Sequence, residues 1–354
     1  MAKCTRMTVG LCIGLATAGC GAATTASDST SSGSSGTNSS SCASGSNDFY
    51  VVENAACASG AGKLSRINPD ATCKAEILTA LNCPIDFVHS AVDKNIGYLS
   101  SKTDGILQVN LSAQTTTKIS TTKRIIAPAG LALLENISSS EREGPCGGNT
   151  LVDSILLIAD EGSELDGGMI WRWCLISTQP SILATGSNPS PVSEVPPSQV
   201  KHPHGVAVKN RTSVFITGQN PDISDTSLSA VLAFRELNKN EVGTVEFLTK
   251  SGDFSNTIKD LTIDSDGTLL IVDAGKSAIL RYDNSAKTLT TLSTGFTGSP
   301  RDIVQSGTDS SGNATYLISQ SDSGVISKTT FASGSSLSTV TTGLTLSGPE
   351  GIAK

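Results

Sequence analysis

The sequence has few aromatic residues, few histidines and no concentration of positive charge. Only 4% of its 354 residues are aromatic, three are histidine, and the formal net charge is −7. Binding to nucleic acid requires clustered Lys and Arg to neutralise phosphates, and the sequence contains no such cluster. Beyond a short N-terminal run, no apolar stretch reaches the roughly 18 residues that span a membrane. We therefore expect no nucleic-acid partner and no further membrane span.

Several motifs of catalytic and metal sites are also missing. The sequence contains no Gly-x-Ser-x-Gly elbow, no phosphate-binding Gly loop and no His-Glu-x-x-His, which are motifs of hydrolases, nucleotide-binding proteins and metalloproteases. It has no Cys-x-x-Cys spacing for redox chemistry or zinc. These absences favour a protein that is not an enzyme, although a Ser–His–Asp constellation assembled by the fold stays open.

The first residues resemble a secretion signal. Lys3 and Arg6 precede the apolar run Met7–Ala18, which is shorter than a membrane span and matches the apolar core of a signal peptide. The run ends in Leu15-Ala16-Thr17-Ala18-Gly19-Cys20, which resembles the lipobox of bacterial lipoproteins. This resemblance implies a signal peptide over residues 1–19 and acylation, including palmitate, at Cys20. The alternative is an ordinary signal peptide cleaved near Ala22-Ala23.

Residues 20–47 predict a flexible tether after the anchor. Ser, Thr, Gly and Ala dominate Gly21–Asn47, and such a composition buries too little apolar area to offset the entropy of ordering the chain. Gly21 stands where enterobacterial lipoproteins kept at the inner membrane have Asp. The resemblance therefore favours a lipid-anchored protein of the bacterial cell envelope at the outer membrane.

Six cysteines remain for the exported domain once Cys4, Cys12 and Cys20 are set aside. An even number in an exported chain predicts disulfides. Cys146 and Cys174 fall within one repeat and are expected to pair. The other four are expected to pair among themselves: Cys42, Cys57, Cys73 and Cys83.

Residues 48–354 consist of repeats of four short strands. The stretch Ile258–Gly295 contains four apolar runs separated by turn residues, which predicts four antiparallel strands and thus one blade of a β-propeller. Similar units follow the proline-containing starts of 84–120, 128–186, 203–252 and 300–343. We place the first strand of the 84–120 unit at His89–Asp93, and the fourth strand of the 128–186 unit at Ser181–Thr185.

Two incomplete units remain, one at each end of this domain. Phe49–Asn54, Lys63–Asn68 and Ala75–Leu81 predict second, third and fourth strands without a first, whereas Gly348–Ala353 predicts a first strand with nothing after it. Together they complete a sixth blade, which closes the ring and removes exposed sheet edges. The predicted fold is an all-β, six-bladed propeller with four-stranded antiparallel blades.

The starts of the first strands resemble NHL repeats. They read Pro-Ala-Gly-Leu-Ala at 128–132, Pro-His-Gly-Val-Ala at 203–207 and Pro-Glu-Gly-Ile-Ala at 349–353. The resemblance implies the six-bladed, TolB-like propeller shared by NHL proteins and the SMP-30/gluconolactonase group. It does not imply catalysis by itself.

First strands line the channel of such a ring, so the residues at their starts predict a ligand-binding channel mouth. Aligned repeats place there His89 (or Asp86), Ala129, His204, Lys259, Asp260, Arg301, Asp302 and Glu350. Resemblance to SMP-30-like lactonases implies a metal held by Glu350 and Asp260 (or Asp302), but His204 replaces the expected Asn. Mutually paired, hydrated charges are the favoured interpretation.

No cofactor is therefore expected, with calcium at the acids or zinc at His89, His202 and His204 as alternatives. The hypothesis drawn from the sequence is a monomeric, lipid-anchored binding or scaffolding module for a protein, peptide or saccharide. The alternative is a metal-dependent hydrolase or lactonase resembling SMP-30.

Overall fold

A computed structural model describes most of the chain from Cys42 to Lys354. It describes residues 42–354 apart from 43–44, 46, 55–56, 58, 120–124, 139–152, 164–166, 176–191, 196–199, 210–212, 220–229, 237–244, 250–251, 256 and 332–339. The predicted signal peptide, the acylated Cys20, most of the tether and Cys146 lie outside these residues.

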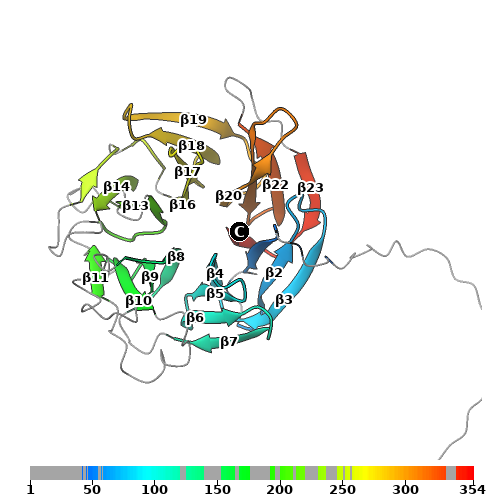
Figure 1. The fold of residues 1–354 in the computed structure, drawn as a ribbon. Coiled ribbons are helices and arrows are strands. Elements are labelled where there is room, and N and C mark those ends of the chain that lie inside the picture. The colour runs from blue at the N-terminus through cyan, green and yellow to red at the C-terminus, as the bar shows by residue number, and fades with distance from the viewer. Residues whose placement is uncertain are drawn as a thin grey trace, which may run out of the picture. The chain divides into compact units, whose positions relative to one another are not determined.

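The described residues form antiparallel sheets of four strands, arranged around a common centre (Figure 1). Three sheets, from the innermost strand outward, are β4(Pro84–His89), β5(Ile96–Ser101), β6(Gly105–Asn110), β7(Thr115–Lys118); β8(Pro128–Glu135), β9(Ser154–Asp160), β10(Met169–Leu175), β11(Val192–Val195); and β12(Val206–Lys209), β13(Ser213–Gln219), β14(Ala230–Glu236), β15(Glu246–Phe247). The other three are β16(Ile258–Ile263), β17(Leu269–Asp273), β18(Ala278–Asp283), β19(Thr288–Thr294); β20(Pro300–Thr308), β21(Ala314–Gln320), β22(Val325–Thr330), β23(Val340–Thr345); and β24(Pro349–Ala353), β1(Phe49–Glu53), β2(Gly62–Ile67), β3(Lys74–Leu81).

The innermost strands contact one another in a closed cycle. The order is β4, β8, β12, β16, β20, β24 and back to β4. Six hydrophobic clusters lie between the sheets, each shared by one pair of neighbours. Each sheet therefore buries both of its faces, which is the arrangement of a β-propeller and confirms that prediction.

Strand alternation explains how one strand serves two clusters. In β1, Phe49 and Val51 pack in the cluster shared with β21 and β22, whereas Val52 packs on the other face against Phe87 and Leu99. Successive side chains of a strand point to opposite faces of the sheet. A continuous apolar strand is thus what a sheet covered on both faces requires.

The two ends of the domain meet in one sheet, as the incomplete repeats predict. β24 is the innermost strand there and pairs antiparallel with β1, with Tyr50 opposite Ala353 and Val51 opposite Ile352. The Asn54 backbone N–H also donates to the carbonyl of Gly348 (2.9 Å). The ring is closed by hydrogen bonds between residues almost 300 positions apart in the sequence.

One first strand lies earlier than predicted. β4 spans Pro84–His89, not His89–Asp93, because the residues after His89 form a turn. The Ser90 hydroxyl accepts a hydrogen bond from the Asp93 N–H, and the Asp93 carboxylate accepts one from the Asn95 N–H. These side chains satisfy the backbone locally and end the strand. The prediction of a strand over 89–93 was wrong.

A fourth strand also lies elsewhere than expected. The fourth strand of this sheet is β11, at Val192–Val195, which pairs with β10 on the side away from β9. The predicted fourth strand at 181–185 lies outside the described residues. Trp171 and Trp173 of β10 are both buried in the cluster between the β4–β7 and β8–β11 sheets.

The four N-terminal cysteines pair among themselves, as predicted. The disulfides are Cys42–Cys73 and Cys57–Cys83. Cys42 falls within the predicted tether, so the described domain holds the chain from at least five residues before the predicted boundary at Asn47. Cys174 is disulfide-bonded, but its expected partner, Cys146, lies outside the described residues. Within those residues no helix has the length and apolarity needed to cross a membrane.

Truncating Ile352 tests the closed ring. Its side chain is buried in the cluster between β24 and β22, so Ile352→Ala is expected to lower the free energy of unfolding by about 2–5 kcal/mol. Ile126→Ala removes an exposed side chain and is expected to change it by less than about 0.5 kcal/mol. Urea denaturation followed by circular dichroism measures both, and equal stabilities would contradict a docked β24.

Candidate functional site

A repeated three-residue pattern begins five of the innermost strands and directly precedes β12. Its first residue is proline in five cases, its second lines the channel mouth, and its third is Asp or Gly. The triplets are Pro84-Ile85-Asp86, Pro128-Ala129-Gly130, Pro203-His204-Gly205, Ile258-Lys259-Asp260, Pro300-Arg301-Asp302 and Pro349-Glu350-Gly351. The second residues surround a cavity of about 150 Å³, and a second cavity of about 300 Å³ opens at the other end of the channel.

The aspartates of the pattern join neighbouring strands of the ring. The Asp86 carboxylate accepts a hydrogen bond from the N–H of Phe87 on its own strand (2.7 Å) and from the N–H of Leu131 on β8 (2.7 Å). Asp302 accepts in the same way from Ile303 and from Ile352 on β24. A carboxylate that accepts two backbone bonds this way fixes the spacing of two innermost strands.

The glycines of the pattern leave room for these carboxylates. A Cβ added to Gly351 would lie 2.6 Å from Oδ1 of Asp86, and one added to Gly205 would lie 2.7 Å from Oδ1 of Asp260. Both distances are shorter than a real Cβ contact. At these two positions the close approach of a neighbouring carboxylate therefore requires a glycine.

Asp260 has a glycine, Gly205, on one side and another aspartate, Asp302, on the other. The next strand carries Asp302, whose own carboxylate already binds the Ile303 N–H, so Asp260 hydrogen-bonds to Asp302 itself. Burial first, and then the Asp302 charge, raise the pKa of Asp260 well above its usual value. Asp260 therefore keeps the proton and donates it in a hydrogen bond to Asp302.

Asp86 also favours its protonated form. Burial, followed by the charge of Asp302, raises the pKa of Asp86 to about 8. The hydrogen bonds from Leu131 and Phe87 oppose this rise without cancelling it. Asp86, Asp260 and Asp302 line both cavities and so form the floor that separates them.

Charged side chains form a rim above this floor. We use the word rim for Lys102, Glu161, His204, Lys259, Arg301 and Glu350, all of which line the smaller cavity. Lys102 and Glu161 follow the second strands β5 and β9 directly. Because a second strand runs antiparallel to the first, its end lies beside the start of the first strand, as the pairs Pro84–Ser101 and Pro128–Asp160 show.

Most of the rim is paired. Glu161 lies 3.2 Å from the Lys102 ammonium and 2.8 Å from Nδ1 of His204. Burial raises the pKa of Glu161, but the His204 hydrogen bond and the charges of His204, Lys102 and Lys259 outweigh it and bring the pKa to about 2. Arg301 Nε lies 3.6 Å from Glu350 and 2.7 Å from the Ser321 hydroxyl.

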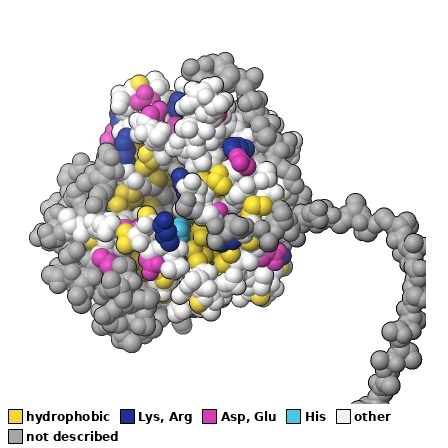
Figure 2. All heavy atoms as spheres, turned by 45° about the vertical axis from the view of Figure 1, so that its right-hand side comes forward, with side chains coloured by type: hydrophobic (Ala, Val, Ile, Leu, Met, Phe, Trp, Pro, Cys, Tyr) yellow, Lys and Arg dark blue, Asp and Glu magenta, His cyan; other side chains and the backbone are white. Residues whose placement is uncertain are grey.

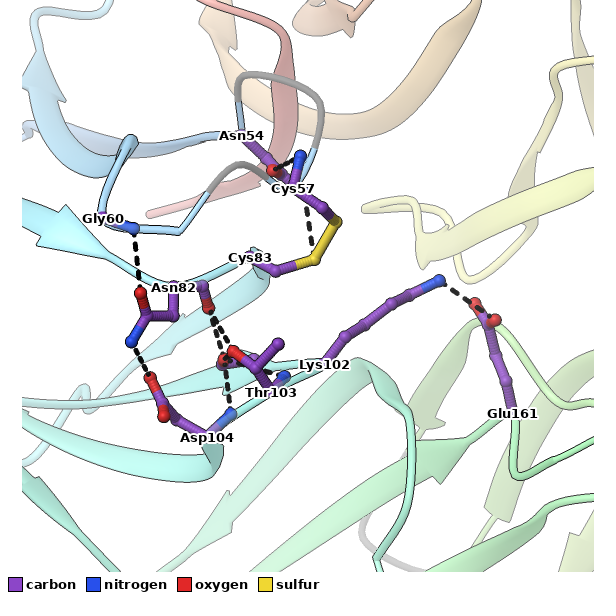
Figure 3. Close-up of a disulfide and its surroundings, with 10 residues drawn as sticks. Asn54, Cys57, Gly60, Asn82, Cys83, Lys102, Thr103, Asp104 and Glu161 are labelled. Atoms are coloured by element: carbon purple, nitrogen blue, oxygen red, sulfur yellow. Dashed lines mark hydrogen bonds and ion pairs between the residues drawn. A yellow bond between two sulfur atoms is a disulfide. The ribbon is translucent and has the colours of Figure 1, made fainter.

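The Cys57–Cys83 disulfide lies beside the rim and supports Lys102 (Figure 3). The Lys102 N–H donates to the carbonyl of Cys83 (3.1 Å), and the Asn82 amide donates to Asp104 in the same turn (3.1 Å). Cys57 itself lines the cavity. The disulfide and the turn thus hold the backbone of Lys102, while its side chain extends to Glu161 (Figure 3).

Six of the seven predicted mouth residues come together at the small cavity: His204, Lys259, Asp260, Arg301, Asp302 and Glu350. His89 does not. It ends β4 at the opposite end of the channel, where its Nε2 lies 2.9 Å from the carbonyl of Lys94. Placing the strand at His89–Asp93 caused this error, and the alternative, Asp86, holds the predicted position.

Sequence reasoning missed Lys102 and Glu161. Neither belongs to a first strand, so aligning first strands could not identify them. The signal that would have found them is their position immediately after a second strand, at Ser101-Lys102 and Asp160-Glu161. The equivalent residue after β1, Asn54, also lines this cavity.

The three histidines do not come together, because His89 lies at the other end of the channel from His204. His202 and His204 instead both contact Glu161, His202 through the Glu161 carbonyl (2.8 Å) and His204 through its carboxylate. Among the described residues, no group of three or more His, Cys, Asp and Glu side chains has the geometry to hold a metal ion.

Comparison with known proteins gives the fold alone. No protein-family profile and no curated protein matches the chain. A chain in a solved structure described as "Crystal structure of Nidogen/Laminin Complex" is similar, with a TM-score of 0.61 and 14% identity over 86% of this chain and 97% of that one. The similarity supports a β-propeller, and the resemblance to NHL repeats and SMP-30 remains one of short motifs.

The floor predicts how stability depends on pH. The pKa of Asp86 is about 8 in the folded protein and 3.8 is its ordinary value. Between these values the unfolded chain has lost a proton that the folded protein keeps, so stability falls as the pH rises. Thermal unfolding is therefore expected at a lower temperature at pH 8 than at pH 5.

The matched variant is Asp86→Asn, which removes this titration. The variant is expected to be less stable at every pH, because its amide nitrogen replaces an oxygen that accepts a hydrogen bond. The readout is therefore the change in unfolding temperature between pH 5 and pH 8. Glu161 titrates below this range, since its pKa is about 2. Burial lowers the pKa of His204, which gives a slope of the opposite sign in wild type and variant alike. A variant whose unfolding temperature depends on pH as the wild type's does would contradict the assignment.

Proposed function

We propose that this propeller is a non-catalytic binding module that recognises a protein, peptide or saccharide at its channel mouth. Counted as one blade each, the sheets make a six-bladed ring of the TolB-like, NHL-containing type. Acylation at Cys20 and the tether to the propeller would hold this monomeric module at the bacterial cell envelope, with the outer membrane favoured. The binding role and the anchoring are separate parts of the proposal.

The observation that carries the binding role is the open cavity beneath the rim. The rim side chains, one from each of the sheets described above, converge on about 150 Å³ of space that no side chain of the described residues fills. A propeller that has no ligand pocket and acts only as part of an assembly is expected to have a channel filled by side chains. Concave sites with a few convergent polar groups are where ligands bind.

The arrangement of the rim favours binding over metal-dependent hydrolysis. A calcium site needs several oxygen ligands around one point, and the resemblance to SMP-30 assigns Glu350 and Asp260 to it. Arg301 lies 3.6 Å from Glu350, and Asp260 is hydrogen-bonded to Asp302. Both carboxyl groups are thus engaged by neighbours that compete with a metal ion, which supports the paired-charge interpretation of the sequence.

Peptides are the first ligands to test, because the similar structure is described as a complex of two proteins. A random peptide display library is selected on the full-length wild-type protein, and the affinity of the enriched peptides is then measured. Ile85→Trp places a large ring at the cavity wall without changing charge. It is expected to weaken binding by about tenfold or more.

The control is Val92→Trp, which adds the same ring at an exposed position at the far end of β4. It is expected to leave affinity unchanged, and circular dichroism verifies that both variants fold. Binding lost in Val92→Trp and kept in Ile85→Trp would move the site to the opposite face. Failure to enrich any peptide, together with no binding to a glycan array, would overturn the proposed role.

A further inference from the structure

Among the described residues, Lys259 is the rim cation without a hydrogen bond or an ion pair within 4.0 Å. Lys102, His204 and Arg301 each have a carboxylate within that distance. The Lys259 side chain lines the cavity and is partly buried, and Glu161 and Glu350 attract its charge only from farther away. A charge removed from water without a direct partner is unfavourable, so an anion in direct contact is what this position lacks.

Arg301 is placed to share such an anion. Lys259 and Arg301 are the second residues of adjacent innermost strands, and the residues that follow them, Asp260 and Asp302, hydrogen-bond to each other. Burial first, and next the charge of Arg301, lower the pKa of Lys259. Two cations at equivalent positions of neighbouring strands thus face the same cavity and repel each other.

The charges around the cavity limit what the anion can be. Within the rim, the cations Lys102, Lys259 and Arg301 outnumber the anions Glu161 and Glu350 by one, and the Asp302 carboxylate below them adds a negative charge. This balance favours a ligand group of single negative charge over a phosphate dianion. Arg and Lys together also suit the planar carboxylate, since Arg presents several donors in one plane.

We propose that the channel mouth binds a carboxylate group between Lys259 and Arg301. A volume of about 150 Å³ admits the end of an acidic side chain or a small free acid, and excludes a whole peptide or sugar chain. The rest of a larger ligand then lies outside the cavity, over the rim. This inference rests on the proposed binding role and specifies the chemical group that the mouth recognises.

The reactivity of Lys259 toward an amine-acylating reagent tests the proposed carboxylate site. Mass spectrometry measures the labelling of each lysine. Only the neutral amine reacts, and a bound carboxylate favours the charged form. The probe acetyl-Gly-Glu-Gly-amide is expected to slow labelling of Lys259 by about tenfold, the effect of one pKa unit. Labelling of Lys287, an exposed lysine at the β18–β19 turn, should not change.

Matched probes isolate the carboxylate. Acetyl-Gly-Gln-Gly-amide, sodium chloride and inorganic phosphate, at equal ionic strength, are expected to give no protection. Sodium acetate distinguishes the sources: protection by acetate but not by the Glu peptide assigns the site to a free small acid, and protection by the Glu peptide assigns it to a side chain. Equal protection by the Gln and Glu peptides, or no protection by acetate and the Glu peptide, overturns the proposal.

The variant Arg301→Met keeps Lys259 available for labelling while removing the second cation. It is expected to raise the probe concentration needed for half-protection by about tenfold, and Lys287→Met is the charge-matched control. A selected peptide that binds through the mouth, as judged by Ile85→Trp, while no carboxylate protects Lys259 would leave the binding role intact and reject this inference alone.

Discussion

The structure depends on backbone amides of one innermost strand donating to an aspartate of the strand before it. Leu131 donates to Asp86, and Ile352 donates to Asp302. Innermost strands of neighbouring sheets belong to no common sheet, and these bonds join them together with others, such as that from the Gly130 N–H to the His204 carbonyl and that from the Ser319 hydroxyl to the Glu350 carbonyl. With side-chain packing, such bonds hold the separation of the innermost strands, and through it the width of the channel and the positions of the rim residues.

The same constraint produces the chemistry of the mouth. Asp86 has Gly351 beside it and Asp260 has Gly205, whereas Asp302 has Asp260 beside it, and a shared proton removes the repulsion between these two. The floor therefore keeps protons on Asp86 and Asp260, and the Asp302 carboxylate adds one negative charge below the rim. The cations above it are balanced by this charge, Glu161 and Glu350. Basic and acidic side chains elsewhere are interspersed on the face shown in Figure 2, so the gathering of cations at the mouth is local.

Repeats in the sequence predicted most of the fold because the turn residues and the triplets at the starts of the first strands both recur along the chain. Turn residues mark the hairpins, and the triplet at the start of each first strand fixes which residues face the channel, which identified His204, Lys259, Arg301 and Glu350 correctly.

His89 was misplaced because an apolar run was followed in preference to Pro84, and the side-chain bonds of Ser90 and Asp93 end that strand. Lys102 and Glu161 were missed because their position at the mouth follows from antiparallel pairing across a hairpin. The proton shared by Asp260 and Asp302 was out of reach because it depends on which strands are neighbours in space.

Hydrogen exchange at two backbone amides tests the central claim most directly. The N–H groups of Leu131 and Ile352 donate to buried carboxylates and, in a closed ring, exchange only when the domain opens. The account predicts slow exchange at both residues, at rates near those of the core strands. Exchange of Ile352 at the rate of an unstructured peptide, while the core strands stay protected, would show that the C-terminal strand is not docked and would contradict the account.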